Sequence, residues 1–375
     1  MINKNRLIRL TQDLIRIPSV NPHGNEAAIA LYVKRYLEKL HIPVRCHSFA
    51  KDRVNVIARL AGTHRTRSLL LTPHLDTVPP GKGWSRDPFD AVVRGDKIYG
   101  LGATDCKGNL AAALEAMHSL HEDGVRLEYT LCMAATADEE SGSVLGLIPL
   151  LQKGFLDVDC AVVLDADDGD IIVTQKGLMH LTLTVAGKRA HGAYPWRGVN
   201  AIEAMAAILQ QLQKTKWQYR ANRYLHPPTV NPGVIRGGDK VNVVADWCAC
   251  ELDFRFLPGM SHQALLTVLR TIARKHARDF SITVQGVQKP YAIDATHPLV
   301  RQLYASMLSA GGRPRIKGSE GATVITFFQG KNIPAVASGF GVTNGAHVVD
   351  EYISIASLYN GTRALEHFLK NFTFK

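Results

Sequence analysis

Short apolar runs alternate with amphipathic helical segments in the first part of the chain, and this alternation limits the fold more than any other feature. Strands that alternate with helices favour a largely parallel sheet covered by helices. The expected helices are residues 4–20, 25–40 and 109–124, and the expected strands include 68–72, 128–136 and 160–170. The sequence therefore predicts an α/β domain.

The pattern changes after residue 177, where strand-like stretches alternate apolar and polar side chains with a period of two. The expected strands there are 178–187, 240–256 and 280–287, and the expected helices are 200–215 and 261–277. This β-α-β-α-β block is typical of an antiparallel sheet with two helices on one face. From residue 290 the first pattern returns. We therefore expect a discontinuous domain with a mixed, mostly parallel sheet, formed by residues 1–177 and 290–375, and a smaller inserted domain at 178–289.

Composition excludes several classes of protein. No apolar run reaches the roughly 18 residues of a membrane span, and the N-terminal segment lacks the apolar core of a signal peptide. The formal charge is +11, but Lys and Arg are spread without a basic block, so we expect neither a nucleic-acid nor a membrane partner. The six cysteines match no zinc-ribbon or disulfide spacing, which favours reduced thiols and a cytoplasmic location.

Potential metal ligands follow the ends of apolar strand-like stretches. They are His74 and Asp76, Asp105, the run from Asp138 to Glu140, Asp165, and His347. Because the carboxyl ends of parallel strands share one edge of a sheet, we expect these side chains to lie close together. Imidazole and carboxylate ligands suit zinc, cobalt or manganese, and two cations need about this many ligands if one carboxylate bridges them.

Each candidate has another explanation when it is taken alone. A histidine at one strand end is usually structural, Asp105 can cap the helix that follows it, and Glu139 and Glu140 can form a solvated turn. The acids that follow Asp165, at 167–170, are expected to face solvent for the most part. What favours a metal site is that all the candidates occur just past strands, in Gly-rich loops.

Six sequence motifs occur in an order that resembles a known superfamily. They are HLDTVPPGKGW, DPFDAVVRGDKIYGLGATDCKGNLAA, ADEESGS, AHGAYPWRGVNAI, GGDKVNVVADWCACELDFRFLPG and GAHVVDEYISI. Together they resemble the zinc metallopeptidase and deacylase superfamily of acetylornithine deacetylase, succinyl-diaminopimelate desuccinylase, aminoacylase and glutamate carboxypeptidase. The resemblance covers nearly the whole chain.

The resemblance implies two divalent metal ions, zinc in the first place with cobalt or manganese as alternatives. His74 and Asp165 would bind one ion, and Glu140 and His347 would bind the other. Asp105 would bridge both ions.

The resemblance also implies two residues that act without binding metal. Asp76 would accept a hydrogen bond from His74 and orient its ring, since a period of two puts both side chains on one side of extended backbone. Glu139 would be the general base, which takes a proton from the attacking water and returns it to the leaving nitrogen.

The inserted domain would contribute three more residues and the contacts of a homodimer. By resemblance, His191 reaches the site of the partner subunit and donates a hydrogen bond to the oxyanion. Arg255 would grip a substrate carboxylate through its planar fork, and Asn242 would also touch substrate. The chain departs from the family at Cys106, where many members have Met, and at Glu320, where the late loop commonly has Asp.

The sequence therefore predicts a two-metal hydrolase that cleaves the linear amide bond of a small N-acyl amino acid or of a short peptide with a free carboxylate. One alternative is a di- or aminopeptidase of the same superfamily. Another is a non-catalytic metal-binding or partner-binding protein, against which the presence of Glu139 beside a full set of ligands argues.

Overall fold

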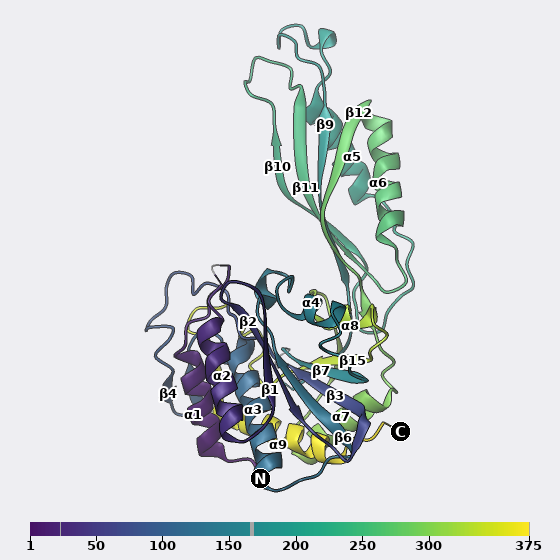
Figure 1. Cartoon of the computed structure of the whole chain (residues 1–375). Coiled ribbons are helices and arrows are strands. Elements are labelled where there is room, and N and C mark those ends of the chain that lie inside the picture. Colours follow the sequence, from purple (N-terminus) through teal and green to yellow (C-terminus); the bar gives the residue numbers. More distant parts are fainter. Residues whose placement is uncertain (23, 166–168, 375) are drawn as a thin grey trace. The chain divides into compact units, whose positions relative to one another are not determined.

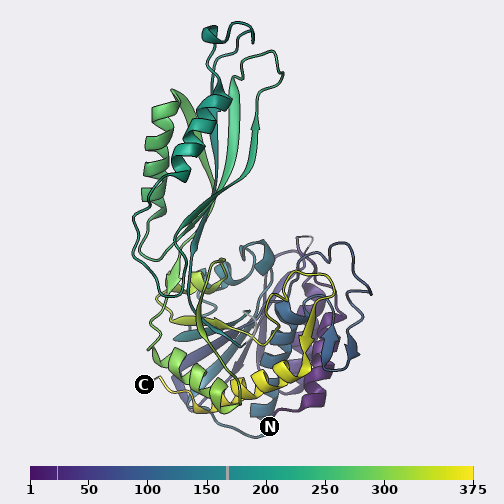
Figure 2. The ribbon, with the colours of Figure 1, turned by 180° about the vertical axis from the view of Figure 1, so that it is seen from behind.

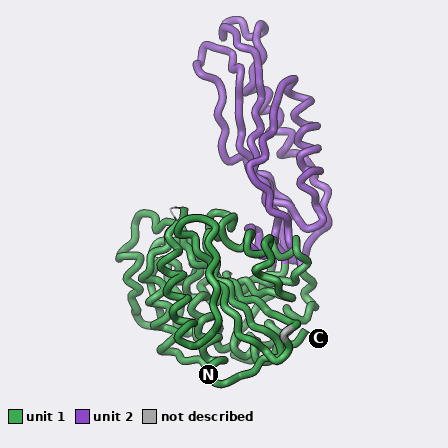
Figure 3. Tube along the Cα trace, in the orientation of Figure 1, with its two compact units in different colours: residues 1–173, 293–317, 327–375 green, residues 174–292, 318–326 purple. Residues whose placement is uncertain are grey.

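The computed structural model describes residues 1–22, 24–165 and 169–374, which form two compact units. Unit 1 contains residues 1–173, 293–317 and 327–375, and unit 2 contains residues 174–292 and 318–326 (Figure 3). The chain thus leaves unit 1 after residue 173 and returns to it at residue 293. Residues 318–326 belong to unit 2, although the sequence pattern grouped them with the C-terminal part of the larger domain.

A mixed sheet forms the centre of unit 1 (Figure 1). Its strands follow in the order β1 (Val44–Ala50), β2 (Arg53–Leu60), β6 (Tyr129–Ala135), β3 (His64–Thr72), β7 (Cys160–Leu164), β15 (Ala335–Ser338), β8 (Ile171–Gln175) and β13 (Tyr291–Ala292), with β14 (Ile316–Ser319) paired to β8. The β6–β3, β3–β7 and β7–β15 pairs are parallel. The centre of β3 is buried on both faces, which explains its continuous apolar run Leu69–Leu71.

Helices cover this sheet, as its parallel strands require. They are α1 (Lys4–Ile15), α2 (Ala27–Lys39), α3 (Gly108–Glu122), α4 (Leu147–Gln152), α7 (Pro298–Ser309), α8 (Ile325–Gln329) and α9 (Ile355–Asn371). Helix α3 packs against α1 and α9 and is buried nearly all round, and α7 lies beside α9 (Figure 2). Within the described ranges, no helix has both the length and the apolar character needed to cross a membrane.

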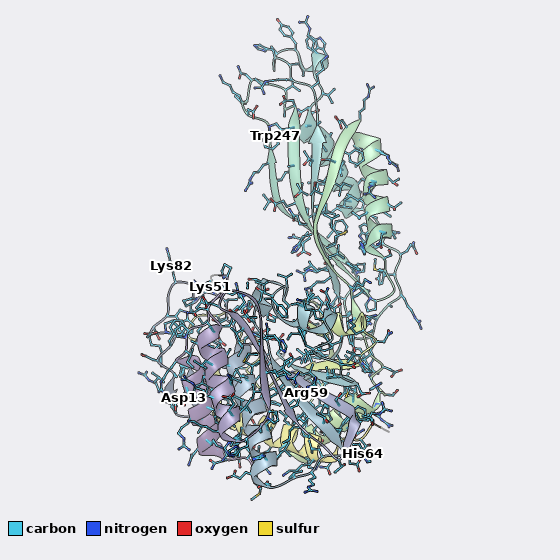
Figure 4. The ribbon with its side chains drawn as sticks, in the orientation of Figure 1. Asp13, Lys51, Arg59, His64, Lys82 and Trp247 are labelled. Carbon is cyan, nitrogen blue, oxygen red and sulfur yellow. The ribbon has the colours of Figure 1, made fainter. Side chains whose placement is uncertain are left out.

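Unit 2 has an antiparallel sheet in the order β10 (Thr229–Gly237), β11 (Trp247–Phe256), β9 (Gly177–Ala186) and β12 (Asp279–Gln288). Trp247, labelled in Figure 4, begins β11. Helices α5 (Ala201–Gln213) and α6 (His262–His276) lie on one face of this sheet (Figure 1). Every second residue of β9 and β11 enters the core beneath these helices. The block is therefore β-α-β-β-α-β.

Strand β10 was not expected from the sequence, and the expected strand 240–256 begins only at Trp247. Pro232 and Gly233 interrupt β10 and coincide with a shift in its register against β11. Proline is tolerated there because β10 is an edge strand, where one row of N–H groups needs no partner in the sheet. Residues that break a strand pattern therefore concealed this strand.

Candidate active site

Three adjacent parallel strands of unit 1 deliver the candidate ligands. His74 follows β3, Glu139 and Glu140 follow β6 in a short helical turn, and Asp165 follows β7. A parallel bridge between His74 and Thr136 continues the pairing of β3 with β6 up to the site. The carboxyl edge of the sheet thus brings together side chains that are far apart in sequence.

Asp105 and His347 come to this edge from loops. Asp105 lies in the turn 103–107 before α3, and the peptide bond that links it to Cys106 is cis. His347 lies in the loop before β16 (Tyr352–Ser354), which pairs with β5 (Lys97–Tyr99) and, through it, with β4 (Val92–Arg94) in a small sheet. The backbone of His347 has a φ of +59°, which side chains rarely adopt and which is often found at functional sites.

The carboxylate of Asp105 lies between two imidazoles. Its Oδ1 is 3.0 Å from Nε2 of His74, and its Oδ2 is 3.2 Å from Nε2 of His347. Asp165 Oδ1 is 3.6 Å from the same His74 nitrogen, and Glu140 Oε1 is 3.1 Å from the same His347 nitrogen. The five side chains therefore form two groups that share one carboxylate. This donor set fits two divalent cations with a bridging aspartate.

The imidazoles of the site are surrounded by carboxylates. Burial opposes a charge on His74, but hydrogen bonds to Asp105 and Asp165 help to raise its pKa well above the usual value. Hydrogen bonds to Asp105 and Glu140 raise the pKa of His347 to about 10. Negative charge therefore dominates the space that the two rings face, as in a site for cations.

The carboxyl groups differ in their pKa although all are largely shielded from solvent. Burial, reinforced by the neighbouring Asp165, raises the pKa of Glu139 well above its usual value, and burial also raises the pKa of Asp165. Burial acts in the same direction on Asp105, but the hydrogen bonds of the two imidazoles hold its pKa below the usual value. Asp105 is therefore the carboxylate that stays ionised most readily between the two rings, as a shared ligand must.

Cys106 lies near His74 and Asp105, but its chemistry does not favour a role as a ligand. Its Sγ accepts a hydrogen bond from the backbone N–H of His74 at 3.1 Å and donates one to the carbonyl of His74 at 3.4 Å. Burial raises the pKa of the thiol to about 12. Because metals bind the thiolate, we assign Cys106 to packing behind His74.

Asp76 is fully buried, and its carboxylate has more partners than the expected histidine. His74 Nδ1 lies 3.0 Å from the backbone carbonyl of Asp76 and 3.5 Å from its Oδ1, so the carbonyl is the closer partner. The carboxylate also accepts the backbone N–H groups of Glu139 at 3.1 Å and Glu140 at 3.0 Å. Asp76 therefore holds the acidic turn as well as the histidine.

The candidates from the inserted domain lie in two places within unit 2. His191 and Asn242 are exposed neighbours, since His191 forms a bridge with Val243 and Gly192 donates to the carbonyl of Asn242. Arg255 lies near the opposite end of β11 from Asn242. Its guanidinium already binds Asp253 through Nε at 2.8 Å and Nη2 at 3.0 Å.

The sequence pattern missed two buried residues behind Asp105. Glu351 accepts the N–H groups of Gly102, Thr104 and Asp105 at 2.8–3.0 Å, and burial raises its pKa to about 7. Lys107 is fully buried and donates to the carbonyl of Ile17 at 2.7 Å; burial lowers its pKa to about 7. One sign of this role is present in the sequence, where Glu351 ends the segment HVVDE that begins with His347.

Asp170 is an exception to the expectation that the acids after Asp165 face solvent for the most part. Asp170 is buried rather than solvent-facing, and its carboxylate binds the guanidinium of Arg315 and the ammonium group of Lys317. These cations, 145 or more residues away in sequence, compensate a charge that would otherwise stay in water. Asp167 and Asp168 lie outside the described residues.

A model of the peptidase family M20/M25/M40 matches residues 70–371 of the chain. The chain belongs to this family. Among its relatives in the family, acetylornithine deacetylase from Klebsiella pneumoniae is 31% identical over 92% of this chain and 92% of its own length. Succinyl-diaminopimelate desuccinylase from Gluconacetobacter diazotrophicus is 30% identical over 97% of this chain and 96% of its own.

Solved structures of M20 proteins and other peptidases share the fold. A tripeptidase from Staphylococcus aureus has a TM-score of 0.82 at 25% identity, covering 99% of this chain and 98% of its own. A dinuclear metal binding M20 peptidase from Bacillus subtilis has a TM-score of 0.77 at 17% identity, covering 98% of this chain and 97% of its own.

These relatives confirm three expectations. The resemblance to the metallopeptidase and deacylase superfamily is confirmed, and so is the two-domain α/β fold with a mostly parallel sheet. The chain is a metal-dependent hydrolase of the amidohydrolase and metallopeptidase type.

Proposed function

We propose that this M20 protein hydrolyses the linear amide bond of small N-acyl amino acids with the help of two divalent cations. The observation that carries the proposal is the Asp105 carboxylate placed between His74 and His347, with Glu139 beside it at the same sheet edge. Relatives 29–32% identical over more than nine-tenths of the chain are named acetylornithine deacetylase or succinyl-diaminopimelate desuccinylase, which supports this substrate class.

We assign the ligands to the two cations according to which imidazole, that of His74 or that of His347, each carboxylate contacts. His74 and Asp165 would hold one cation, Glu140 and His347 the other, and Asp105 both. Imidazole and carboxylate ligands suit zinc first, with cobalt and manganese as alternatives. Bound cations would supply Lewis acidity toward water and the amide carbonyl.

Glu139 is the proposed general base. Its backbone N–H is held by Asp76, and burial together with Asp165 favours a carboxyl group that keeps a proton once it has received one. Glu139 would take a proton from the attacking water and return it to the leaving nitrogen, which one group can do because the water oxygen and that nitrogen are both bonded to the same carbonyl carbon after attack.

Unit 2 would complete the site by binding the substrate. His191 and Asn242 lie together and expose polar groups that can donate to the developing oxyanion and to the substrate. Most of the excess of Lys and Arg over Asp and Glu also lies in unit 2, which would attract an anionic substrate. Binding of a substrate carboxylate by Arg255 stays a prediction. It requires that the Arg255 guanidinium either releases Asp253 or binds Asp253 and the substrate carboxylate at the same time.

The test of the function is a panel of amides, measured on protein reconstituted with zinc, cobalt or manganese. We expect kcat/KM to be highest for an N-acetyl or N-succinyl amino acid and at least about tenfold lower for dipeptides, since one mismatched contact in a polar pocket costs a factor of this size or more. Faster hydrolysis of dipeptides or tripeptides would establish the peptidase alternative. The likeness of the fold to that of the Staphylococcus aureus tripeptidase is the reason for testing this alternative. No turnover of any amide would leave the non-catalytic alternative.

A homodimer formed through unit 2 is the second part of the proposal. Strand β10 is at one edge of the sheet, and Ile235 on it is 54% exposed. Ile202 of α5 is 42% exposed and lies beside the end of β10, near Gly237. An edge strand with exposed apolar side chains pairs readily with another chain, so a second copy is the proposed partner.

We expect sedimentation to show a dimer at micromolar concentration and the double variant I202K/I235K to be monomeric. If His191 acts in the partner's site, this variant also loses roughly a hundredfold in kcat, the usual effect of removing one oxyanion donor. V287K is the matched control, because Val287 is 37% exposed on β12, the opposite edge strand. A monomeric wild-type protein, or a dimer that V287K disrupts instead, would contradict the proposal. The cytoplasmic location stays a prediction.

A further inference from the structure

The acidic turn after β6 is held by an unusual set of acceptors. Four successive backbone N–H groups, from Ala137 to Glu140, donate to side-chain oxygens. Ala137 donates to Asn55 at 2.9 Å, Asp138 to Glu26 at 3.3 Å, and Glu139 and Glu140 to the two oxygens of Asp76 at 3.1 and 3.0 Å. These N–H groups belong to the residues that place the proposed base and one proposed ligand.

The three acceptors are fully buried, and two of them are carboxylates. Arg53 compensates them, since its Nη1 binds Glu26 at 2.7 Å and its Nη2 donates to Asn21 Oδ1 at 3.0 Å. Asn21 in turn donates to Asp76 at 2.7 Å. One guanidinium is therefore connected to both carboxylates that hold the turn. We call Asn21, Glu26, Arg53, Asn55 and Asp76 the turn clamp.

The turn itself has a backbone that needs such support. Asp138 has a φ of +65°, in the left-handed region that is uncommon for residues other than glycine and that surrounding contacts help to stabilise. Its carboxylate accepts the N–H of Leu145 at 2.9 Å and lies 3.4 Å from Nη1 of Arg53. Arg53 and Asn55 are two residues apart on β2, so the same face of one strand contacts Ala137 and Asp138 at the start of the turn.

We propose that Arg53, acting through Glu26, Asn21 and Asp76, is a positioning residue that sets the place of the Glu139 carboxylate. The inference rests on the proposed function, in which Glu139 is the general base. Asn21, Glu26 and Arg53 all lie before residue 70, where the match to the family model begins. A base displaced by about 1 Å loses roughly a hundredfold in rate, which is the effect expected when the clamp opens.

A purely structural role for Arg53 is the alternative, and the chain offers a matched comparison. Arg6 of α1 binds Glu115 of α3 through Nε at 2.6 Å and Nη2 at 2.9 Å, and Glu115 is fully buried. This pair has the same chemistry and burial but does not contact the acidic turn. R53Q and R6Q therefore lose comparable stability, and only R53Q changes the support of Glu139.

A second pair of variants disturbs the clamp without removing a charge. A Cβ on Gly24, which has a φ of +58°, would lie 2.1 Å from Nε of Arg53 and would displace the guanidinium. Gly95 has a φ of +59° and no heavy atom within 4 Å of such a Cβ. G24A and G95A thus carry the same backbone strain, and only G24A moves Arg53.

The experiment measures kcat and KM of the metal-loaded protein for the best amide of the panel. We expect R53Q and G24A to lose roughly a hundredfold in kcat, with KM and metal content within twofold of wild type. R6Q and G95A are expected to keep kcat within twofold. A kcat within twofold for R53Q, or an equal loss in R6Q, would overturn the proposal; if R53Q does not fold, G24A against G95A decides in the same way.

Amide hydrogen exchange supplies a readout that does not depend on activity. The N–H groups of residues 137–140 are expected to exchange slowly in the wild type and in R6Q, and faster in R53Q and G24A. Unchanged protection in both clamp variants would overturn the proposal even if their activity fell. If the wild type hydrolyses no amide, the proposed function has failed, and exchange alone then shows whether the clamp holds the turn.

Discussion

Replacement of Glu139 by glutamine is expected to lower kcat by about a thousandfold while the protein still binds its cations. General acid–base catalysis contributes roughly 10²–10⁴-fold, and glutamine keeps the shape and the backbone N–H that Asp76 accepts but cannot take a proton. Steady-state kinetics on the best amide of the panel, with metal analysis of the same sample, measures both quantities.

The adjacent glutamate is the natural comparison for this variant. Glu140 lies 3.1 Å from His347 Nε2 and is a proposed ligand, so E140Q is expected to lose bound metal together with activity. If E139Q loses activity but keeps its metal, and E140Q loses both, then Glu139 acts as a base and the adjacent Glu140 as a metal ligand. If E139Q keeps more than a tenth of wild-type kcat, Glu139 is not the general base.

Removal of the cations by a chelator is expected to abolish hydrolysis and to lower the melting temperature. Asp105, Glu140 and Asp165 lie around the same space, and their mutual repulsion is compensated by a bound cation. At a thousandfold excess over its Kd, a ligand that binds only the folded state stabilises it by about 4 kcal/mol. Zinc, cobalt or manganese should restore activity, whereas calcium should not, because calcium prefers oxygen ligands to imidazole.

A second histidine near strand β3 provides the control for metal binding. His74 follows β3, whereas His64, labelled in Figure 4, is the first residue of that strand. We expect H74A and H347A each to lower the metal content by about one ion per chain, and H64A to leave it unchanged. An equal effect of H64A, or full activity of the chelated protein, would remove the basis of the two-cation proposal.

The position of the candidate ligands along the chain was predictable because it depends on local patterns. A buried parallel strand is a continuous apolar run, and the residue just past it lies at the carboxyl edge of the sheet, so His74 and Asp165 could be placed there from sequence. Strand β10 was not predictable in this way, because Pro232 and Gly233 suppress the strand signal at an edge that tolerates them.

Burial of charged side chains was not predictable from local patterns. Glu26 precedes α2 and Arg53 begins β2, where a single charged residue normally faces solvent. Both are buried because they meet each other and the acidic turn, and the Glu26 side chain bonds a backbone N–H 112 residues away. Asp170 differs from the expectation for the same reason, since its cationic partners are distant in sequence.

The sequence by itself determined the α/β class, the alternation of strands and helices in the first part of the chain, and which kinds of side chain stand at the strand ends, because these follow from periodicity and residue chemistry over a few neighbouring positions. Only the tertiary structure decided that Asp105 lies between two imidazoles and that Arg53 supports the turn of Glu139. Such contacts depend on which distant segments the packed core brings together, and no local pattern encodes that distance.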